Sequence, residues 1–210
     1  MTTSSLAYHE AELRVARDAT HPQRLVPDPP PSGRILDIGC GAGQTIIALE
    51  CGGRSVGIDI DVDALRHAAS GAMGERLRVA AAAGERLPFR DGAFDFAFSR
   101  VALPYMNIPA ALSEMHRVLR PGGTLWLALH PLAIPVEQFR RGNLRGKLYA
   151  AGTIANGIWF HLTGRTLQIG SRLCESIQSE RGMRQALRRA GFSRIAFQRT
   201  SIHFVVTAER

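Results

Sequence analysis

The sequence has few of the features that indicate disulfides, metal-binding cysteines or a membrane span. Its 210 residues include three cysteines, and Cys40, Cys51 and Cys174 are too scattered to form a zinc motif or a disulfide framework. No apolar run approaches the roughly 20 residues that cross a bilayer. The first residues lack a basic region followed by an apolar core, the pattern of a secretory signal. We therefore expect one domain in the reducing cytoplasm, without a membrane partner.

Lysine is almost absent, yet the chain is basic. Lys147 is the single lysine, and 26 basic against 18 acidic residues give a net charge of +8. The arginines are spread along the chain, and their densest group, Arg140, Arg141 and Arg145, is not interleaved with aromatic residues as in single-strand nucleic-acid binders. We do not expect nucleic acid as a partner, although an RNA-binding or RNA-modifying protein that uses this basic surface stays an alternative.

A glycine-rich turn between two apolar runs is the most informative pattern that is present. Residues 35–38 are apolar except for Asp37, Gly39-Cys40-Gly41-Ala42-Gly43 follows, and a second apolar run ends at Asp59. The carboxyl ends of parallel strands meet at one sheet edge, so the turn and Asp59 are expected to lie together. Glycines let a ligand approach the backbone closely, and a carboxylate can accept hydrogen bonds from a ribose diol. The pattern predicts a nucleoside site.

The spacing of the glycines disfavours a dinucleotide. A dinucleotide fingerprint needs Gly-x-Gly-x-x-Gly, but the third glycine here, Gly43, comes one residue early, and Gln44 takes the expected place. Asp37 would repel a pyrophosphate and suits a cationic ligand. An oxidoreductase is therefore the weaker interpretation.

Four segments together resemble class I S-adenosylmethionine-dependent methyltransferases. Residues 37–43 match the first motif of that family, and Asp59 matches the acidic residue that ends its second strand. Residues 84–89, 94–98 and 114–125 are similar to its later loop, fourth strand, and helix with Pro-Gly-Gly turn and fifth strand. The resemblance implies an α/β fold, a three-layer sandwich with a mostly parallel seven-stranded sheet that ends in an antiparallel hairpin. It also implies S-adenosylmethionine as the cofactor.

The same resemblance suggests which residues contact the cofactor. The family often has an aspartate that reaches adenine, but this chain has Ala83 there, so backbone groups, Glu85 or apolar contacts such as Leu87 would hold the base. The expected cofactor-binding residues are Asp37, Gly39, Cys40, Gly41, Gly43, Asp59, Ile60, Glu85 and Ser99.

Apolar patterning predicts alternating strands and helices through most of the chain, which is typical of a parallel sheet covered on both faces. The expected strands are residues 34–38, 55–59, 77–81, 94–99, 124–130, 194–199 and 202–207. The expected helices are residues 44–51, 62–71, 108–118 and 182–190.

Two segments lie outside this alternation. Residues 1–33 combine a helix over residues 6–19 with a proline-rich linker, and we expect a flap over the ligand or a helix packed on the core. Residues 34–210 form the remaining domain. Within it, residues 131–181 exceed a normal connection and follow the fifth strand on the ligand-binding edge. We expect a substrate lid of two helices there, with a dimer interface or stabilising cap as the alternative.

Methyl transfer requires positioning more than side-chain chemistry, and a general base only where the acceptor must lose a proton. His130 and Tyr105 are the catalytic candidates, whereas Cys40, His116 and His161 suit packing or solvent. No metal-ligand cluster can be assembled, and the motifs of DNA and arginine methyltransferases are absent.

We therefore expect a small, largely apolar metabolite as the acceptor, with Trp159 and Phe160 as apolar cover. The protein would be a monomer or a homodimer. A non-catalytic module with the same fold stays the second hypothesis.

Overall fold

A computed structural model describes the chain in segments. They are residues 3–21, 23–71, 77–129, 143–169, 172–173, 175–199 and 204–210. Among these residues no helix is long and apolar enough to cross a membrane.

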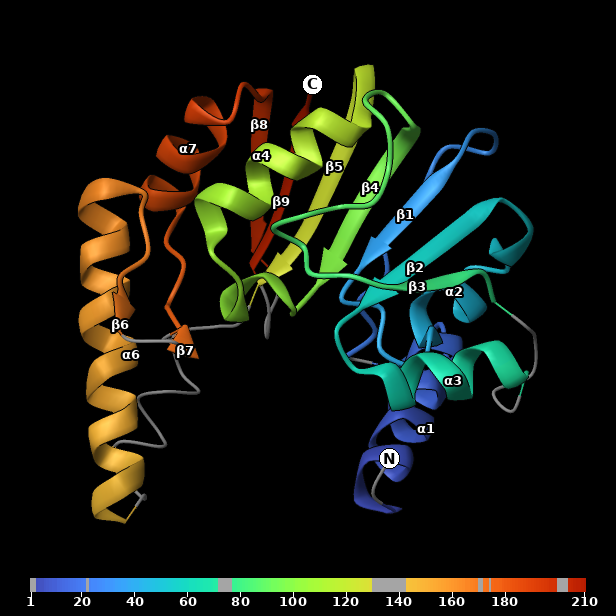
Figure 1. The fold of residues 1–210 in the computed structure, drawn as a ribbon, viewed down its shortest axis with the longest axis horizontal. Helices are drawn as coiled ribbons and strands as arrows, with labels where there is room; N and C mark the ends of the chain where they lie inside the picture. The colour runs from blue at the N-terminus through green and yellow to red at the C-terminus, as the bar shows by residue number, and fades with distance from the viewer. Residues whose placement is uncertain are drawn as a thin grey trace.

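Seven strands form one sheet in the order β3-β2-β1-β4-β5-β9-β8 (Figure 1). The strands β1 to β5 pair in parallel, and β9 pairs antiparallel with both β5 and β8. The strands are β1 (Ile35–Ile38), β2 (Ser55–Asp59), β3 (Val79–Ala81), β4 (Phe94–Arg100), β5 (Leu119–Leu129), β8 (Ser193–Arg199) and β9 (Phe204–Glu209). The expected mostly parallel sheet with an antiparallel end hairpin is confirmed.

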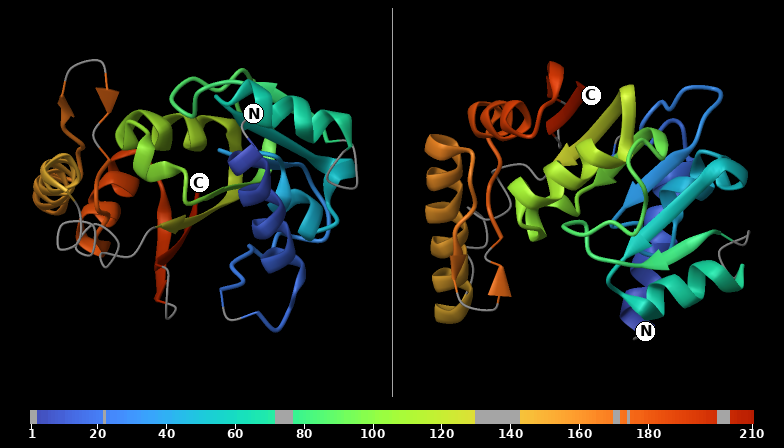
Figure 2. Two further views of the ribbon diagram at one scale, coloured as in Figure 1. Left: turned by 90° about the horizontal axis from the view of Figure 1, so that it is seen from below. Right: turned by 45° about the horizontal axis from the view of Figure 1, so that its top comes forward.

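Helices cover both faces of this sheet, as Figures 1 and 2 show. The helices are α1 (Thr3–Arg17), α2 (Gln44–Ala48), α3 (Val62–Ser70), α4 (Ile108–Val118), α6 (Leu144–Thr163) and α7 (Glu180–Arg189), with short 3-10 turns η1 (Gly52–Arg54) and η2 (Leu103–Tyr105). Successive side chains of a strand point to opposite faces of the sheet, so each strand contributes side chains to the packing on both faces. Ile35, Phe96 and Phe98 pack with α1, α2 and α3, whereas Leu36 and Leu127 pack with α4 and α7.

One local expectation was wrong. The strand β5 begins at Leu119, not at residue 124, because Leu119 already pairs with Phe94 and the Pro-Gly-Gly turn forms a register shift inside the strand. The described part of the insertion holds one long helix, α6, followed by the two-stranded ribbon β6 (Gln168–Ile169) and β7 (Arg172–Leu173). The side chain of Asn143 caps the start of α6, and Gly164 in the left-handed region ends it.

Candidate functional site

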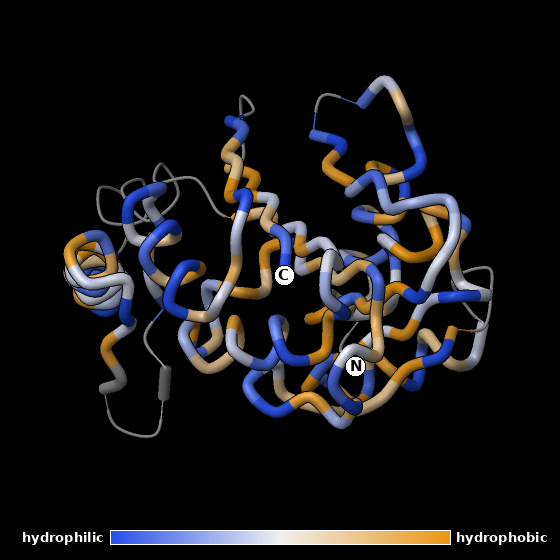
Figure 3. Tube along the Cα trace, turned by 90° about the horizontal axis from the view of Figure 1, so that it is seen from above, coloured by the Kyte–Doolittle hydropathy of each residue, from blue (hydrophilic) through white to orange (hydrophobic). Residues whose placement is uncertain are grey.

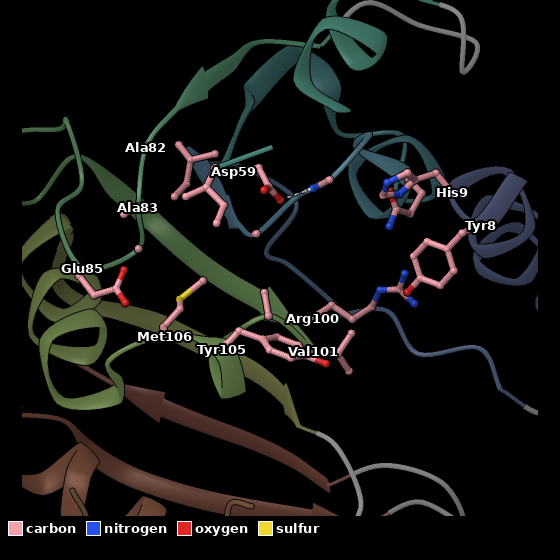
Figure 4. A pocket seen from close by; sticks show the side chains of 17 residues that line it. Tyr8, His9, Asp59, Ala82, Ala83, Glu85, Arg100, Val101, Tyr105 and Met106 are labelled. Carbon is pink, nitrogen blue, oxygen red and sulfur yellow. Dashed lines mark hydrogen bonds between the residues drawn. The ribbon is translucent and has the colours of Figure 1, made fainter. Parts of the chain in front are cut away.

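A cavity of about 540 Å³ opens at the carboxyl ends of β1, β2 and β4. This volume lies within the range of small-molecule sites, about 300–1,000 Å³. Six of the residues predicted for the site line it, namely Gly39, Gly41, Asp59, Ile60, Glu85 and Tyr105. Figure 4 shows Asp59 near the middle, Glu85 and Met106 at one end, and Tyr8 and Arg100 at the other.

The carboxylate of Asp59 is held against the glycine turn. Its Oδ2 accepts the backbone N–H of Gly41 at 2.8 Å (Figure 4), and its Oδ1 accepts that of Asp61 at 2.9 Å. An ionised carboxylate has about four lone-pair sites, so each oxygen keeps one for a ligand. The position of Asp59 at the end of β2 and the two backbone donors thus hold its carboxylate in place. This carboxylate is the acceptor that the sequence predicted for a ribose diol.

The three glycines of the turn are required by the protein itself. Gly39, Gly41 and Gly43 have φ of 78°, 53° and 80°, a region that only glycine adopts readily. A Cβ at Gly39 would lie 2.2 Å from the Cβ of Ala102, and one at Gly41 would lie 2.7 Å from the Cε1 of His9. The Cβ positions therefore meet neighbouring protein atoms, so these glycines shape the turn before any ligand arrives.

Four predicted cofactor residues do not line the cavity, namely Asp37, Cys40, Gly43 and Ser99. Asp37, Cys40 and Ser99 are buried, with exposed fractions of 2%, 3% and 0%. Burial raises the pKa of the Asp37 carboxyl from 3.8 to about 8, and burial also raises the pKa of the Cys40 thiol. A thiol with a raised pKa is a poor nucleophile, which agrees with Cys40 as a packing residue. The hydroxyl of Ser99 has no hydrogen-bond partner.

The end of the cavity away from Tyr8 and Arg100 is formed by residues that follow β3. Ala82, Ala83 and Glu85 line it, and the side chain of Ile60 is 76% exposed at its rim. Glu85 Oε1 accepts the N–H of Asn107 at 2.7 Å, which leaves Oε2 available for a ligand amino group. Leu87 is buried and does not line the cavity.

The helix α1 supplies one wall of the cavity. Tyr8 and His9 line the cavity from α1, and Gln44 lines it from the start of α2. His9 Nδ1 and Gln44 Oε1 are buried and make no hydrogen bond. The spacing of residues 6–19 predicted the helix, but nothing in the sequence indicates which of its residues reach the glycine turn.

A nearly buried ion pair ties this helix to the sheet. The guanidinium of Arg100, at the end of β4, lies 2.6 Å from Glu12 Oε2, and the two side chains are 9% and 26% exposed. Arg100 lines the cavity beside Val101, which has φ of 55°. Positive φ is strained for a β-branched residue, and such strain is common at functional sites. The one feature of the sequence that could have indicated a role for Arg100 in the site was its position directly after the expected strand of residues 94–99.

Tyr105 is 55% exposed and lines the cavity from η2. Burial of the phenol raises its pKa, and so do the charge of Glu175 and a hydrogen bond to it. Tyr105 is therefore a neutral donor near pH 7, and its partner Glu175 also accepts a hydrogen bond of 2.9 Å from Tyr149 Oη on α6. The other catalytic candidate, His130, lies outside the described residues.

Four other residues that the sequence analysis considered do not line the cavity. Phe160 is fully buried against α7, and Trp159 is 42% exposed on α6. His116 packs edge-to-face on Phe192, and His161 Nδ1 lies 2.9 Å from Ser179 Oγ. Among the described residues, no group of three or more His, Cys, Asp or Glu side chains is arranged to hold a metal ion.

Comparison with known proteins shows which proteins this chain resembles. Residues 36–127 match the model of the methyltransferase domain. An uncharacterized methyltransferase of Synechocystis is 34% identical over 123 residues, which are 50% of this chain and 55% of that protein. A demethylmenaquinone methyltransferase of Roseiflexus castenholzii is 37% identical over 101 residues, 46% of this chain and 42% of that protein. The matches thus span about half the length of these relatives.

Solved structures support the same fold. A Thermotoga maritima protein described as a SAM-dependent methyltransferase, possibly a histamine N-methyltransferase, superposes with a TM-score of 0.58. It is 17% identical, and the superposition covers 96% of this chain and 88% of that one. The chain shares the Rossmann-like fold of solved S-adenosylmethionine-dependent methyltransferases, and its residues 36–127 are similar to the methyltransferase domain. S-adenosylmethionine is the cofactor that this similarity implies.

The cavity suits that cofactor. Asp59 offers acceptors for a ribose diol, and the apolar end near Ala82 and Ala83 suits a flat base. The unpartnered buried atoms His9 Nδ1 and Gln44 Oε1 lie at the polar end, where the amino-acid part of the cofactor needs hydrogen bonds.

Proposed function

We propose that the chain is an enzyme that transfers the methyl group of S-adenosylmethionine to a small, largely apolar acceptor. The observation that carries the proposal is the cavity itself, which joins the glycine turn and Asp59 to an uncharged tyrosine on η2. S-adenosylmethionine, when bound, supplies an activated methyl group on a sulfonium. The chain's own residues must then hold two molecules in line and exclude water.

The residues that would hold the cofactor are those predicted from the sequence together with the α1 wall. Asp59 would bind the ribose, Glu85 and Ile60 the base, and Gly39 and Gly41 would allow close approach of the backbone. Gly43, Cys40, Asp37 and Ser99 would support the turn from below. Tyr8, His9, Gln44 and Arg100 extend this set toward the amino-acid end.

On the acceptor side, Tyr105 would orient the substrate as a hydrogen-bond donor or acceptor. It could take a proton from an acceptor only by passing its own proton to Glu175, because its pKa is raised. His130, which directly follows β5 in the sequence, stays the second catalytic candidate. We retain residues 1–33 as flap and linker, and residues 34–210 as the methyltransferase domain with the insertion at 131–181.

The apolar character of the acceptor is supported by the alanines, Val101 and Met106 in the cavity wall. A relative that acts on demethylmenaquinone, an apolar quinone, agrees with this class of substrate. The acceptor would enter beside Tyr105, whose ring is half exposed.

Two measurements test the proposal in sequence. Thermal denaturation with millimolar S-adenosylmethionine or its demethylated product should raise the melting temperature of the wild-type chain, and much less that of Asp59→Ala. If neither ligand stabilises the wild type, the cofactor assignment fails.

Incubation with methyl-labelled cofactor and a small-molecule extract then tests the acceptor. Label that partitions into an organic solvent supports an apolar acceptor. Label that follows the RNA fraction, with binding that weakens steeply with salt, supports the RNA-modifying alternative instead. Cofactor binding without any labelled product supports the non-catalytic alternative.

A further inference from the structure

The outer face of α6 exposes an unusual amount of apolar surface. Most of the large hydrophobic side chains that are exposed in the described residues lie on or just after this helix. They are Leu144 (74%), Leu148 (66%), Tyr149 (49%), Ile158 (58%), Trp159 (42%), Leu162 (57%) and Leu167 (37%). None of them lines the cofactor cavity.

Most of these side chains form one stripe. Leu144, Leu148, Ile158 and Leu162, with exposed alanines at 151 and 155, recur at the three- and four-residue spacing of a single helical face. Trp159 borders the same face. We call this set the α6 stripe. It extends over five turns, about 27 Å at 1.5 Å per residue.

The stripe is not the side by which α6 packs on the protein. Thr153, Gly157 and Phe160 are on the opposite side and are buried. A Cβ at Gly157 would lie 2.8 Å from Ile177, and one at Gly182 would lie 2.6 Å from Phe160, so that inner face fits closely. Figures 1 and 2 place α6 at one end of the molecule, and Figure 3 shows its hydrophobic residues there.

The charged residues of α6 itself are all basic. The helix α6 contains no acidic residue, and Arg145 and Lys147 are exposed in its first turns. At its other end Arg165 is exposed, and the guanidinium of Arg189 donates to the carbonyl oxygen of Thr163. An apolar face with cationic groups at both ends is the pattern of helices that lie in the interface of an anionic membrane.

We infer that the α6 stripe docks the protein on the surface of an anionic lipid bilayer. The leucines and Trp159 enter the boundary between headgroups and acyl chains, while Arg145, Lys147 and Arg165 meet lipid phosphates. A second copy of this chain complements the stripe less well, since pairing two α6 helices in either direction brings cationic ends together. This inference concerns a surface apart from the cavity and does not depend on methyl transfer.

The natural tryptophans provide the probe. The chain has two, the buried Trp126 and Trp159 at the border of the stripe. In the Trp126→Phe variant, emission reports Trp159 alone. Vesicles of phosphatidylcholine with phosphatidylglycerol should shift that emission to shorter wavelength and sediment the protein, whereas phosphatidylcholine alone should bind it about tenfold or more weakly.

A matched pair of variants identifies the surface. Leu148→Gln with Leu162→Gln should lower binding to the anionic vesicles by about tenfold or more, because two anchoring side chains lose their apolar burial. Val62→Gln, on α3 and 44% exposed, removes a comparable exposed apolar side chain and should leave binding unchanged. Circular dichroism checks that each variant is folded.

Three outcomes would overturn the inference. The first is no partition of the wild type onto vesicles of either composition. The second is a dimer by light scattering that Leu148→Gln with Leu162→Gln dissociates, which would assign the stripe to a second copy. The third is protection of Trp159 from iodide quenching in the absence of vesicles, which would mean that the stripe is already covered within the chain.

Discussion

The two ends of the sheet differ in the groups that they bury and in those that they expose. At the β3-β2-β1-β4 end, buried polar atoms such as His9 Nδ1, Gln44 Oε1 and Ser99 Oγ are left without partners, and Val101 and three glycines adopt positive φ. At the β5-β9-β8 end, α6 packs closely on one face and exposes leucines on the other. The first end holds the cavity, and the second exposes a broad apolar surface.

The largest effect at the first end, which holds the cavity, is expected when a single methyl group is added to the glycine turn. Gly39→Ala places a side chain at φ 78° and 2.2 Å from the Cβ of Ala102. Left-handed strain and overpacking together should lower the free energy of unfolding by about 3 kcal/mol or more. Urea denaturation measures this loss. Gly53→Ala, where no atom lies within 4 Å of the new Cβ, is the matched control and should change stability little.

Removal of the ion pair between α1 and β4 should have the next largest effect. Glu12→Gln leaves the nearly buried guanidinium of Arg100 without its carboxylate, which should cost about 2–3 kcal/mol of stability, since Glu12 is partly exposed. Cofactor affinity should fall with it, because α1 carries Tyr8 and His9. Asp63→Asn breaks the exposed pair with Arg66 and should cost under about 0.5 kcal/mol. Equal losses in both variants would refute a special role for α1.

Asp59→Ala tests the ribose acceptor. We expect a loss of about 2 kcal/mol in affinity for S-adenosylmethionine, roughly thirtyfold in Kd, by calorimetry. Because Asp59 also holds Gly41 and Asp61, Asp59→Asn serves as a gentler companion that keeps one oxygen. Asp61→Asn preserves the cap of α3 and should bind the cofactor as the wild type does. Unchanged affinity in a folded Asp59→Ala protein would remove Asp59 from the site.

The buried carboxyl of Asp37 should make stability depend on pH. Its native pKa is raised from 3.8 to about 8, so the folded chain retains a proton that the unfolded chain releases. The free energy of unfolding should therefore fall as pH rises from about 4 to about 8, by up to about 1.4 kcal/mol per pH unit, and level off above. Asp37→Asn cannot titrate and should lose this slope in urea denaturation. If the free energy of unfolding changed with pH by the same slope in the wild type and in Asp37→Asn, Asp37 would not be the cause of the pH dependence.

The smallest expected effect lies at the opposite end of the sheet. Trp159 does not line the cavity, so Trp159→Ala should change S-adenosylmethionine affinity less than about threefold, under 1 kcal/mol. Cofactor titration checks this, with light scattering beside it to detect a change in mass. A large loss of cofactor affinity would mean that the two ends of the sheet are coupled. Lower turnover at unchanged cofactor affinity would favour the insertion as a substrate lid.

The sequence predicted the sheet end that holds the cavity better than the other end. The periodic segments β2 and α4 have the expected bounds, because short apolar runs and caps are local signals. The contact of His9 with the glycine turn could not be predicted, since it joins residues about 30 positions apart through tertiary packing. The link from Tyr105 to Glu175 was missed for the same reason. The helix α6 continues through Gly157, because that glycine packs closely against Ile177 and does not end the helix.

The order of the chain leaves the strand β5 with an unpaired edge during synthesis. Every described residue that lines the cavity precedes Asn107, so the ribosome has made all of these residues before it completes β5. The free edge of β5 then waits for β9, which is translated some 75 residues later and pairs antiparallel with it. An unpaired hydrophobic strand edge is prone to join other chains. The nascent protein is therefore exposed to aggregation in the interval between the synthesis of these two strands.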